Sequence, residues 1–245
     1  MKAIVLFLFA FTIHCSFGQV GVSQKTFEPI SLVNKIEFQN TKFNQPKFSC
    51  AFLLMYKNDT FAITAKHLLK IIKTNKMNAV SFENEVSNWS FYPLNHTSET
   101  IVADKLLNEN KAELLENKST FEKDWLVFSI KENHANIKPL QLRTSPLTMG
   151  EKLYVVGWTR TMEEGKQRVY EFEYHKTIGN RILLKEVIVP EKFGGLSGAP
   201  LVDEKGLVVG VVSNATIDPE SNEKYFSPCT LNGIISVIEQ NTKGK

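Results

Sequence analysis

Short apolar runs separated by turn residues dominate the pattern along this chain. Runs of this kind, rich in Val, Ile, Phe and Leu, are typical of strands. The first two flank Asn58-Asp59, a pair typical of a hairpin turn. The strand candidates, in chain order, are "SCAFLLMYK", "TFAITA", "NAVSF", "WSFYPL", "DWLVFSI", "KLYVVGW", "RVYEFEY", "RILLKEVIV", "PLV" and "LVVGVVS".

Helical spacing of apolar residues is confined to a few places. It occurs in "HLLKIIK" from His67, weakly at 112–115, and in "LNGIISVIEQ" at 231–240. Many short strands without alternating helices predict an all-β barrel or sandwich rather than a parallel α/β sheet. The strands suffice for two β-barrels of similar size, joined through the polar, proline-bearing stretch 131–149. We expect the last helix to pack on the second barrel.

The N-terminus has the pattern of a secretory signal peptide. It begins with a basic residue, continues with an apolar run over 3–13, and has small residues at Ser16 and Gly18. A membrane anchor would need about 20 apolar residues, and this run is well short of that. We therefore expect cleavage after Gly18, and an exported protein, periplasmic or secreted, that has no membrane contact once residues 1–18 are removed.

The composition is that of a globular protein, and it argues against several classes of function. Of the 245 residues, 42% are hydrophobic and 22% are charged, and the formal net charge is +3. So small a charge does not favour binding to nucleic acid. The sequence has no HExxH motif, paired-cysteine spacing or phosphate-binding glycine loop, so we expect no metal and no cofactor. Cys50 and Cys229 could form a disulfide or stay free thiols.

Two segments place a titratable side chain at the end of a strand candidate. In "FAITAKHLL", His67 lies between a strand and a short amphipathic helix, where a surface histidine is the alternative. In "EKDWLVFSI", Asp124 leads directly into an apolar strand. A carboxylate drawn to the edge of a core needs partners, and orienting an imidazole through its Nδ1–H is a suitable role. Asp104, in "IVADKLL", is the alternative candidate, in a less strand-like setting.

The third segment, "GGLSGAP", surrounds one serine with glycines and leads into a predicted hairpin. A serine hydroxyl that attacks a carbonyl creates an oxyanion, and two backbone N–H groups must already point at it. Gly195 would let the preceding peptide take the required orientation, and Gly198 would allow close packing. The amides of Gly195 and Ser197 are then the natural oxyanion hole, although a glycine-rich loop with an incidental serine is a common alternative.

In the order His, Asp, Ser, the segments "TAKH", "DWLVF" and "GLSGAP" resemble the trypsin-like (chymotrypsin-fold) serine peptidases. The resemblance covers most of the mature chain. It implies an all-β fold of two six-stranded antiparallel β-barrels packed together, with a C-terminal helix. On this basis residues 19–135 form the barrel that carries His67 and Asp124. Residues 136–245 form the barrel that carries Ser197, together with the helix.

The resemblance also implies a role for each residue. His67 would be the general base, Asp124 would orient it, and Ser197 would be the nucleophile that forms an acyl-enzyme. Gly195 and Ser197 would form the oxyanion hole, and Ser213, in "LVVGVVSN", would support the aspartate. The partner is then a peptide or protein substrate. The oligomeric state is not predicted.

Two positions depart from the animal members of the family. Animal trypsins have an aspartate where Leu196 stands, and it receives the freed N-terminal ammonium on activation. A leucine cannot form that ion pair, so we expect the oxyanion loop to be held by packing, as in bacterial exported members. Lys66 stands where those enzymes usually have alanine, and we expect its side chain to point outwards.

The substrate pocket is only weakly indicated. Counting back from Ser197 places Glu191 near the floor of the primary specificity pocket, where an acid would favour Lys or Arg in the substrate. Lys192 beside it could neutralise this effect. Ala215 and Thr216 would lie along the pocket wall, where small side chains leave room.

Two other interpretations of the sequence stay open. A trypsin-fold binding protein could keep the three residues and lose a competent oxyanion loop or an open pocket, because fold alone does not establish activity. The second alternative is an unrelated β-sandwich adhesin or carbohydrate-binding domain, in which all three segments would have arisen by chance in the right order. A reactive Ser197 hydroxyl separates the peptidase from the binding protein.

Overall fold

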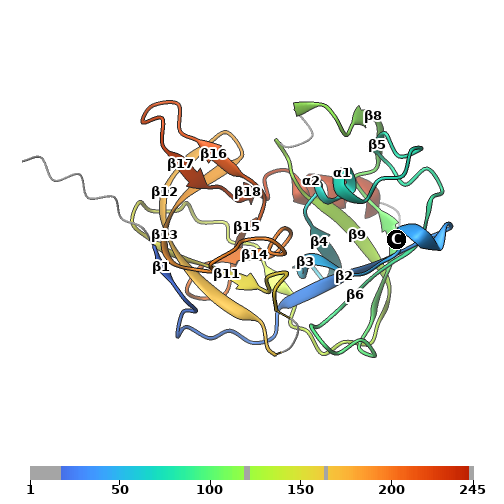
Figure 1. Cartoon of the computed structure of the whole chain (residues 1–245), viewed down its shortest axis with the longest axis horizontal. Coiled ribbons are helices and arrows are strands. Elements are labelled where there is room, and N and C mark those ends of the chain that lie inside the picture. The colour runs from blue at the N-terminus through green and yellow to red at the C-terminus, as the bar shows by residue number, and fades with distance from the viewer. Residues whose placement is uncertain (1–17, 119–121, 163–164, 243–245) are drawn as a thin grey trace, which may run out of the picture.

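The computed structural model describes residues 18–118, 122–162 and 165–242, so the predicted signal peptide lies outside the described residues apart from Gly18. Within these residues the chain forms two β-barrels that lie side by side (Figure 1). The predicted all-β fold of two six-stranded antiparallel barrels and a C-terminal helix is confirmed.

The first barrel is a closed ring of six antiparallel strands, in which β4 pairs back onto β3. In ring order its strands are β3 (Gln45–Tyr56), β2 (Ser31–Phe38), β6 (Val86–Tyr92), β7 (Ile101–Leu106), β9 (Leu126–Asn133) and β4 (Asp59–Thr64). The smaller elements beside it are η1 (Thr41–Phe43), α1 (Leu68–Ile72), β5 (Ala79–Val80) and β8 (Asn110–Leu114).

The second barrel closes in the same way, through the pairing of β12 with β13. In ring order its strands are β12 (Arg168–Ile178), β11 (Lys152–Gly157), β14 (Pro200–Val202), β15 (Val208–Val211), β18 (Cys229–Thr230) and β13 (Arg181–Val189). A further hairpin, β16 (Ala215–Ile217) and β17 (Lys224–Phe226), extends from β13.

The strands nearest the seam are buried on both faces, which explains their unbroken apolar runs. In β3, Ala51 and Leu53 face the core of the first barrel, while Phe52 and Leu54 face the seam between the barrels. Successive side chains of a strand point to opposite faces. β11 alternates likewise, since Leu153 and Val155 face the core of the second barrel and its neighbouring residues face the seam.

Short segments from each half brace the other half. β1 (Gln19–Val20) lies in the range predicted for the first barrel, yet it pairs parallel with β13 of the second. β10 (Leu140–Gln141), in the connection between the barrels, pairs parallel with β3. The two barrels are therefore joined by backbone hydrogen bonds as well as by apolar packing.

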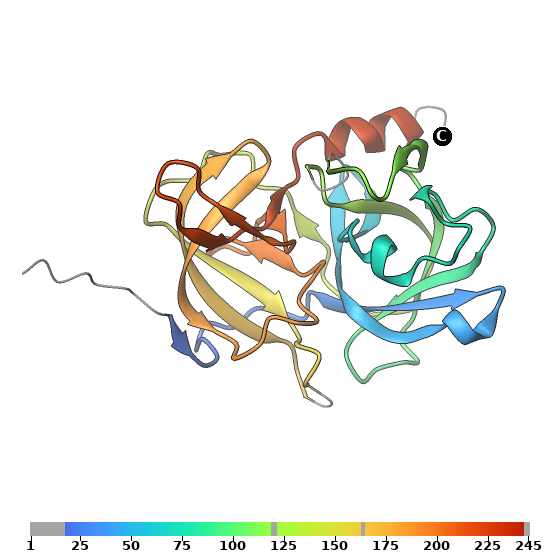
Figure 2. The same cartoon turned by 45° about the horizontal axis from the view of Figure 1, so that its top comes forward.

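The C-terminal helix α2 (Ile234–Thr242) lies against the first barrel (Figure 2), so its expected position on the second barrel was wrong. Tyr56 and Lys57, in the β3–β4 hairpin, both donate hydrogen bonds to Glu239. Ile234 and Ile238 join the apolar cluster of the seam. The helix lies there because its buried isoleucines share this cluster with Phe61 and Ile63 of β4. No helix among the described residues is long and apolar enough to cross a membrane.

Candidate active site

Three side chains from both barrels meet at the seam. β4 and β9 pair with Thr64 opposite Leu126, so the segment after β4 and the segment before β9 leave the sheet at one edge. The first carries His67, at the start of α1, and the second carries Asp124. Ser197 precedes β14 of the second barrel, and its carbonyl accepts a hydrogen bond from the Cys50 amide of β3. A backbone contact across the seam therefore fixes the serine relative to the first barrel.

The three side chains form a continuous hydrogen-bonded line. The Nε2 atom of His67 lies 2.9 Å from Ser197 Oγ, and its Nδ1 atom lies 2.7 Å from Asp124 Oδ2. The His67 amide also donates to Asp124 Oδ1, at 2.7 Å. An imidazole held in this way can take the proton from the hydroxyl through Nε2, while the carboxylate fixes the tautomer and stabilises the imidazolium.

The Asp124 carboxylate is fully buried and stays ionised because several donors surround it. Burial by itself raises its pKa, but the hydrogen bond from His67, the attraction of that imidazole and the hydrogen bond from Ser213 outweigh this effect. The net result is a pKa below the ordinary value. Ser213 in turn accepts a hydrogen bond from Arg181 Nη1, at 2.6 Å.

Asp104, the alternative carboxylate, lies away from this line of side chains. It is exposed on β7, and it accepts a hydrogen bond from Ser129 Oγ at 3.2 Å. Of the two aspartates that the sequence offered, the structure brings only Asp124 to His67.

The glycines around Ser197 are required by close backbone approaches. Gly195 has φ +104°, and a Cβ atom there would lie 2.5 Å from the Arg160 amide nitrogen. The Arg160 amide donates a hydrogen bond to the Gly194 carbonyl oxygen, at 2.6 Å. The segment around Arg160 therefore holds the glycine loop in place. Among the described residues, none accepts a hydrogen bond from the amide of Gly195 or of Ser197. Both N–H groups are thus available to an oxyanion.

We expect Gly198→Ala to remove both activity and much of the stability. Gly198 has φ +85°, and an added Cβ atom would lie 2.1 Å from the Cys50 carbonyl oxygen and 2.4 Å from Thr64 Oγ1. Both atoms belong to the first barrel, so the barrels would have to separate. The free energy of unfolding, measured in urea, should fall by about 3–5 kcal/mol. Gly194→Ala is the matched control, because a Cβ atom there meets nothing within 4 Å. An equally stable Gly198→Ala protein would contradict this account of the seam.

Leu196 takes the place of a charged anchor beneath the oxyanion loop. Its side chain is fully buried in the core of the second barrel, in contact with the region around Gly157 and Ala199. Apolar packing therefore holds the loop, since a leucine offers no group to an ammonium ion.

Lys66 does not point outwards, and that expectation was wrong. Its side chain is only 5% exposed, and its Nζ atom lies 2.7 Å from Glu113 Oε1 on β8. The neighbouring His67 faces the active site, so Lys66 has to project toward the segment that packs over this edge of the barrel. Lys66 and Glu113 are 47 residues apart in the sequence, so no local pattern predicts that they pair.

The Lys66–Glu113 pair yields a stability prediction with an internal control. Glu113→Gln removes the charge that compensates a buried ammonium group, so the free energy of unfolding should fall by about 1–3 kcal/mol. Glu116→Gln removes two ion pairs, with Lys70 and Lys73, but Glu116 is 62% exposed. Its loss should therefore cost much less stability, because solvent screens exposed pairs. Chemical denaturation at low ionic strength compares the two, and equal effects would contradict the role given to burial.

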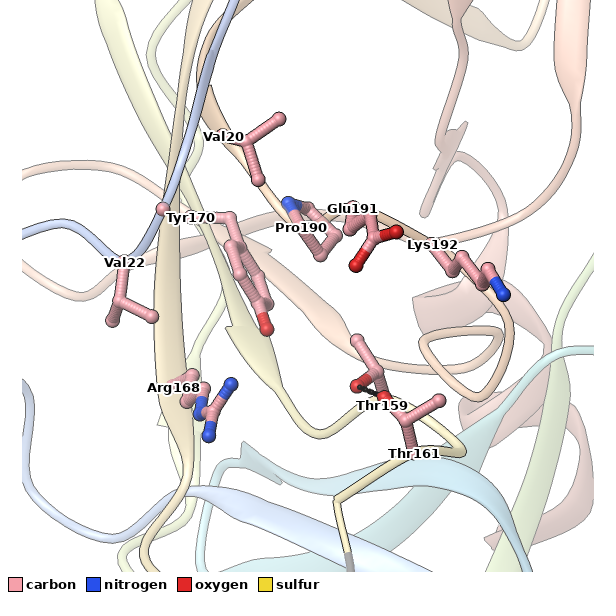
Figure 3. Close-up of a pocket in the computed structure, with 10 residues that line it drawn as sticks. Val20, Val22, Thr159, Thr161, Arg168, Tyr170, Pro190, Glu191 and Lys192 are labelled. Carbon is pink, nitrogen blue, oxygen red and sulfur yellow. Dashed lines mark hydrogen bonds between the residues drawn. The ribbon is translucent and has the colours of Figure 1, made fainter.

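The proposed substrate-pocket residues do not gather in one hollow. Glu191 is exposed and lines a hollow of about 320 Å³ on the second barrel, where its carboxylate points toward the space between Tyr170 and Thr159 (Figure 3). Ala215 and Thr216 lie on β16 and do not line this hollow, nor does any of the three side chains at the seam. No local pattern predicts this hollow, because its walls come from distant segments.

Both cysteines are buried free thiols. Cys50 donates to the Trp158 carbonyl oxygen, and burial raises its pKa to about 12. Cys229 accepts a hydrogen bond from the Asp124 amide at 3.2 Å. A thiol so protonated and buried is unreactive. Within the described parts of the chain, no three His, Cys, Asp or Glu side chains are grouped so as to hold a metal ion.

Comparison with known proteins adds a family match. The model of the Trypsin family matches residues 35–235. The active form of a protease from M. tuberculosis is similar in fold, with a TM-score of 0.55 and 16% identity over 99% of this chain and 96% of that chain. Neuropsin, a serine protease expressed in the limbic system of mouse brain, has a TM-score of 0.59 and 16% identity over 87% and 94%.

A serine endoprotease from Yersinia pestis is also similar, with a TM-score of 0.54 and 14% identity over 88% of this chain and 64% of that chain. At such identities the likeness to these solved structures concerns the fold. A search of curated protein sequences finds no match.

Proposed function

The chain belongs to the trypsin family and is a serine endopeptidase, and we propose that Ser197 is its nucleophile, His67 its general base and Asp124 the residue that orients the base. One observation carries this assignment. The Ser197 hydroxyl, the His67 imidazole and the buried Asp124 carboxylate form one hydrogen-bonded line, with both contacts of the imidazole below 3 Å. In a peptide hydrolase this line connects the attacking oxygen to a proton acceptor.

The reaction proposed is hydrolysis of a peptide bond in two stages. Ser197 Oγ attacks the carbonyl carbon of the substrate while His67 Nε2 takes the hydroxyl proton. The carbonyl oxygen becomes an oxyanion, which accepts hydrogen bonds from the amides of Gly195 and Ser197. His67 then gives the proton to the leaving amine, which departs and leaves an acyl-enzyme. Water, deprotonated by His67, hydrolyses the ester and restores the free serine.

The alternative is a binding protein of the same fold that has lost activity. Such a protein would not need a reactive hydroxyl or two unoccupied amides. The amides of Gly195 and Ser197 bind no acceptor among the described residues, which supports the enzyme.

A fluorophosphonate probe tests the proposal directly. The purified mature protein is treated with the probe, digested and mapped by mass spectrometry, with heat-denatured protein as the control. We expect one adduct, on the peptide that contains Ser197, in the native sample alone. A folded, unlabelled protein that also fails to cleave a mixed peptide library would overturn the proposal in favour of the binding protein.

We propose also that the protein is exported and acts in the periplasm or outside the cell. The basic start, the apolar run and the small residues before Gln19 support removal of residues 1–18. The intact mass of the protein recovered from the extracytoplasmic fraction should correspond to a chain that begins at Gln19. A mass that includes residues 1–18 would contradict this.

A further inference from the structure

The line of hydrogen bonds at the seam continues one residue beyond Ser213. Arg181 Nη1 donates to Ser213 Oγ at 2.6 Å and also to the Ser227 carbonyl oxygen at 3.4 Å. Ser213 Oγ donates a hydrogen bond to Asp124 Oδ2, the oxygen that also accepts the hydrogen bond from His67 Nδ1. A guanidinium group on the second barrel therefore reaches the buried carboxylate of the first barrel through a single hydroxyl.

Strand register fixes this contact. Arg181 is the first residue of β13 and lies opposite Cys229 of β18. Cys229 lies opposite Val211 of β15 on its other side, and Ser213 follows two residues later. The backbone of Arg181 is thus placed by a pairing that also builds the barrel.

The chemistry of the three groups determines the direction of each hydrogen bond. A guanidinium has donors only, an ionised carboxylate has acceptors only, and a serine hydroxyl has one hydrogen and two lone pairs. Because Arg181 can only donate to Ser213, the single hydrogen of Ser213 has to point elsewhere. The Asp124 carboxylate, whose pKa is lowered, is the acceptor that it meets.

The charges that face this carboxylate come from several elements. The His67 imidazole approaches from the start of α1, and the Arg181 guanidinium approaches through Ser213 from β13. The Cys229 thiol of β18 accepts the Asp124 amide, and burial raises the pKa of this thiol so that it stays neutral. The Lys66 ammonium, near the same thiol, is compensated by a carboxylate on β8. Among the residues that the structure describes, Arg181 is thus the cation that donates to the Ser213 hydroxyl, itself a hydrogen-bond donor to Asp124.

We propose that Arg181 is a positioning residue of the active site, which orients the Ser213 hydroxyl so that it donates to Asp124 and holds the carboxylate in line with His67. The inference rests on the proposed peptidase function. Arg181 contacts neither the substrate nor the reacting atoms, so its effect passes through Ser213 and should disappear when Ser213 cannot donate.

The test measures fluorophosphonate labelling in a set of variants, with the maximal rate constant (kinact) separated from the probe affinity (KI). Arg181→Met removes every donor and should lower kinact about tenfold, the value of one charge-assisted hydrogen bond, with KI unchanged. Arg181→Lys keeps a donor-only cation and should recover most of the rate. Arg181→Gln offers an amide oxygen that can take the Ser213 hydrogen, so it should be slower than the lysine variant.

A double-mutant cycle shows whether the effect passes through Ser213. Ser213→Ala should lower kinact about as much as Arg181→Met, and the double variant should be no slower than the slower single variant. Arg143→Met is the matched control: that arginine is part-buried and bonded to Glu151 and Asp203, so its loss should change the melting temperature and leave kinact unchanged.

The possible outcomes separate the inference from the function it rests on. A labelled wild type with an unchanged Arg181→Met rate, a lysine variant no faster than Met, or multiplicative losses in the double variant would overturn the role of Arg181 and leave the peptidase intact. If Arg181→Met does not fold, the kinact values of Arg181→Lys and Arg181→Gln are compared instead. A lysine variant no faster than the glutamine variant would then overturn the role of Arg181. An unlabelled, folded wild type would overturn both proposals.

Discussion

Ser197→Ala is expected to lower kcat for peptide hydrolysis by about 10⁶-fold, to a residual rate about 10³–10⁴ above the uncatalysed reaction. The hydroxyl oxygen is the attacking atom in the proposed mechanism, and no other nucleophile lies within hydrogen-bond distance of His67 Nε2 among the described residues. The residual rate comes from the oxyanion site, which alanine leaves intact because the amide at position 197 remains.

Ser129→Ala is the matched control for this substitution. Ser129 lies on β9 and bonds to Asp104, away from the seam, so its removal should leave kcat unchanged. Both variants are compared on the best substrate from the peptide library, with circular dichroism to verify folding. A folded Ser197→Ala protein with activity comparable to the wild type would exclude Ser197 as the nucleophile.

Asp124→Asn should reduce kcat by about 10⁴-fold at neutral pH while the fold is kept. The asparagine amide nitrogen would donate to His67 Nδ1, and the imidazole would then carry its proton on Nε2. That nitrogen lies 2.9 Å from Ser197 Oγ and could no longer accept its proton. Single-turnover acylation kinetics measure this loss without interference from product release.

Asp104→Asn is the control for the aspartate, because Asp104 is the exposed carboxylate that the sequence also offered. A similar loss in both variants would contradict the assignment. Stability should separate them as well. Since the pKa of Asp124 lies below its ordinary value, the ionised group stabilises the folded state at neutral pH, and this contribution is lost as the pH falls through the folded-state pKa.

Local patterns were enough to predict the three segments of the site and most of the barrel strands, but they missed β2, β7 and β18. The apolar runs of β3 and β11 and the β3–β4 turn depend on near neighbours in sequence, which is the information a pattern contains. The turn itself lies at Lys57-Asn58, one residue before the predicted pair. The motif around Ser197 could also be predicted, because close backbone approach restricts the residue types on either side of it.

Contacts between distant segments could not be predicted from local sequence patterns. Arg181 meets Ser213 only through the register of three strands, and Lys66 meets Glu113 only because β8 folds over the edge of the first barrel. The position of α2 depended on which barrel left apolar area uncovered, and the spacing of isoleucines along the helix is the same for either.

The position of the site at the seam also governs when activity can arise during folding. His67 and Ser197 are 130 residues apart and belong to different barrels. A chain that has folded only its first half would hold the proposed base and its aspartate but not the proposed nucleophile. The β1–β13 pairing joins Gln19 and Val20 to residues shortly before the serine, and so distant a contact is slow to form. We therefore expect a nascent or half-folded molecule to be inert toward its neighbours, and proteolysis to begin only when the last long-range contacts have formed.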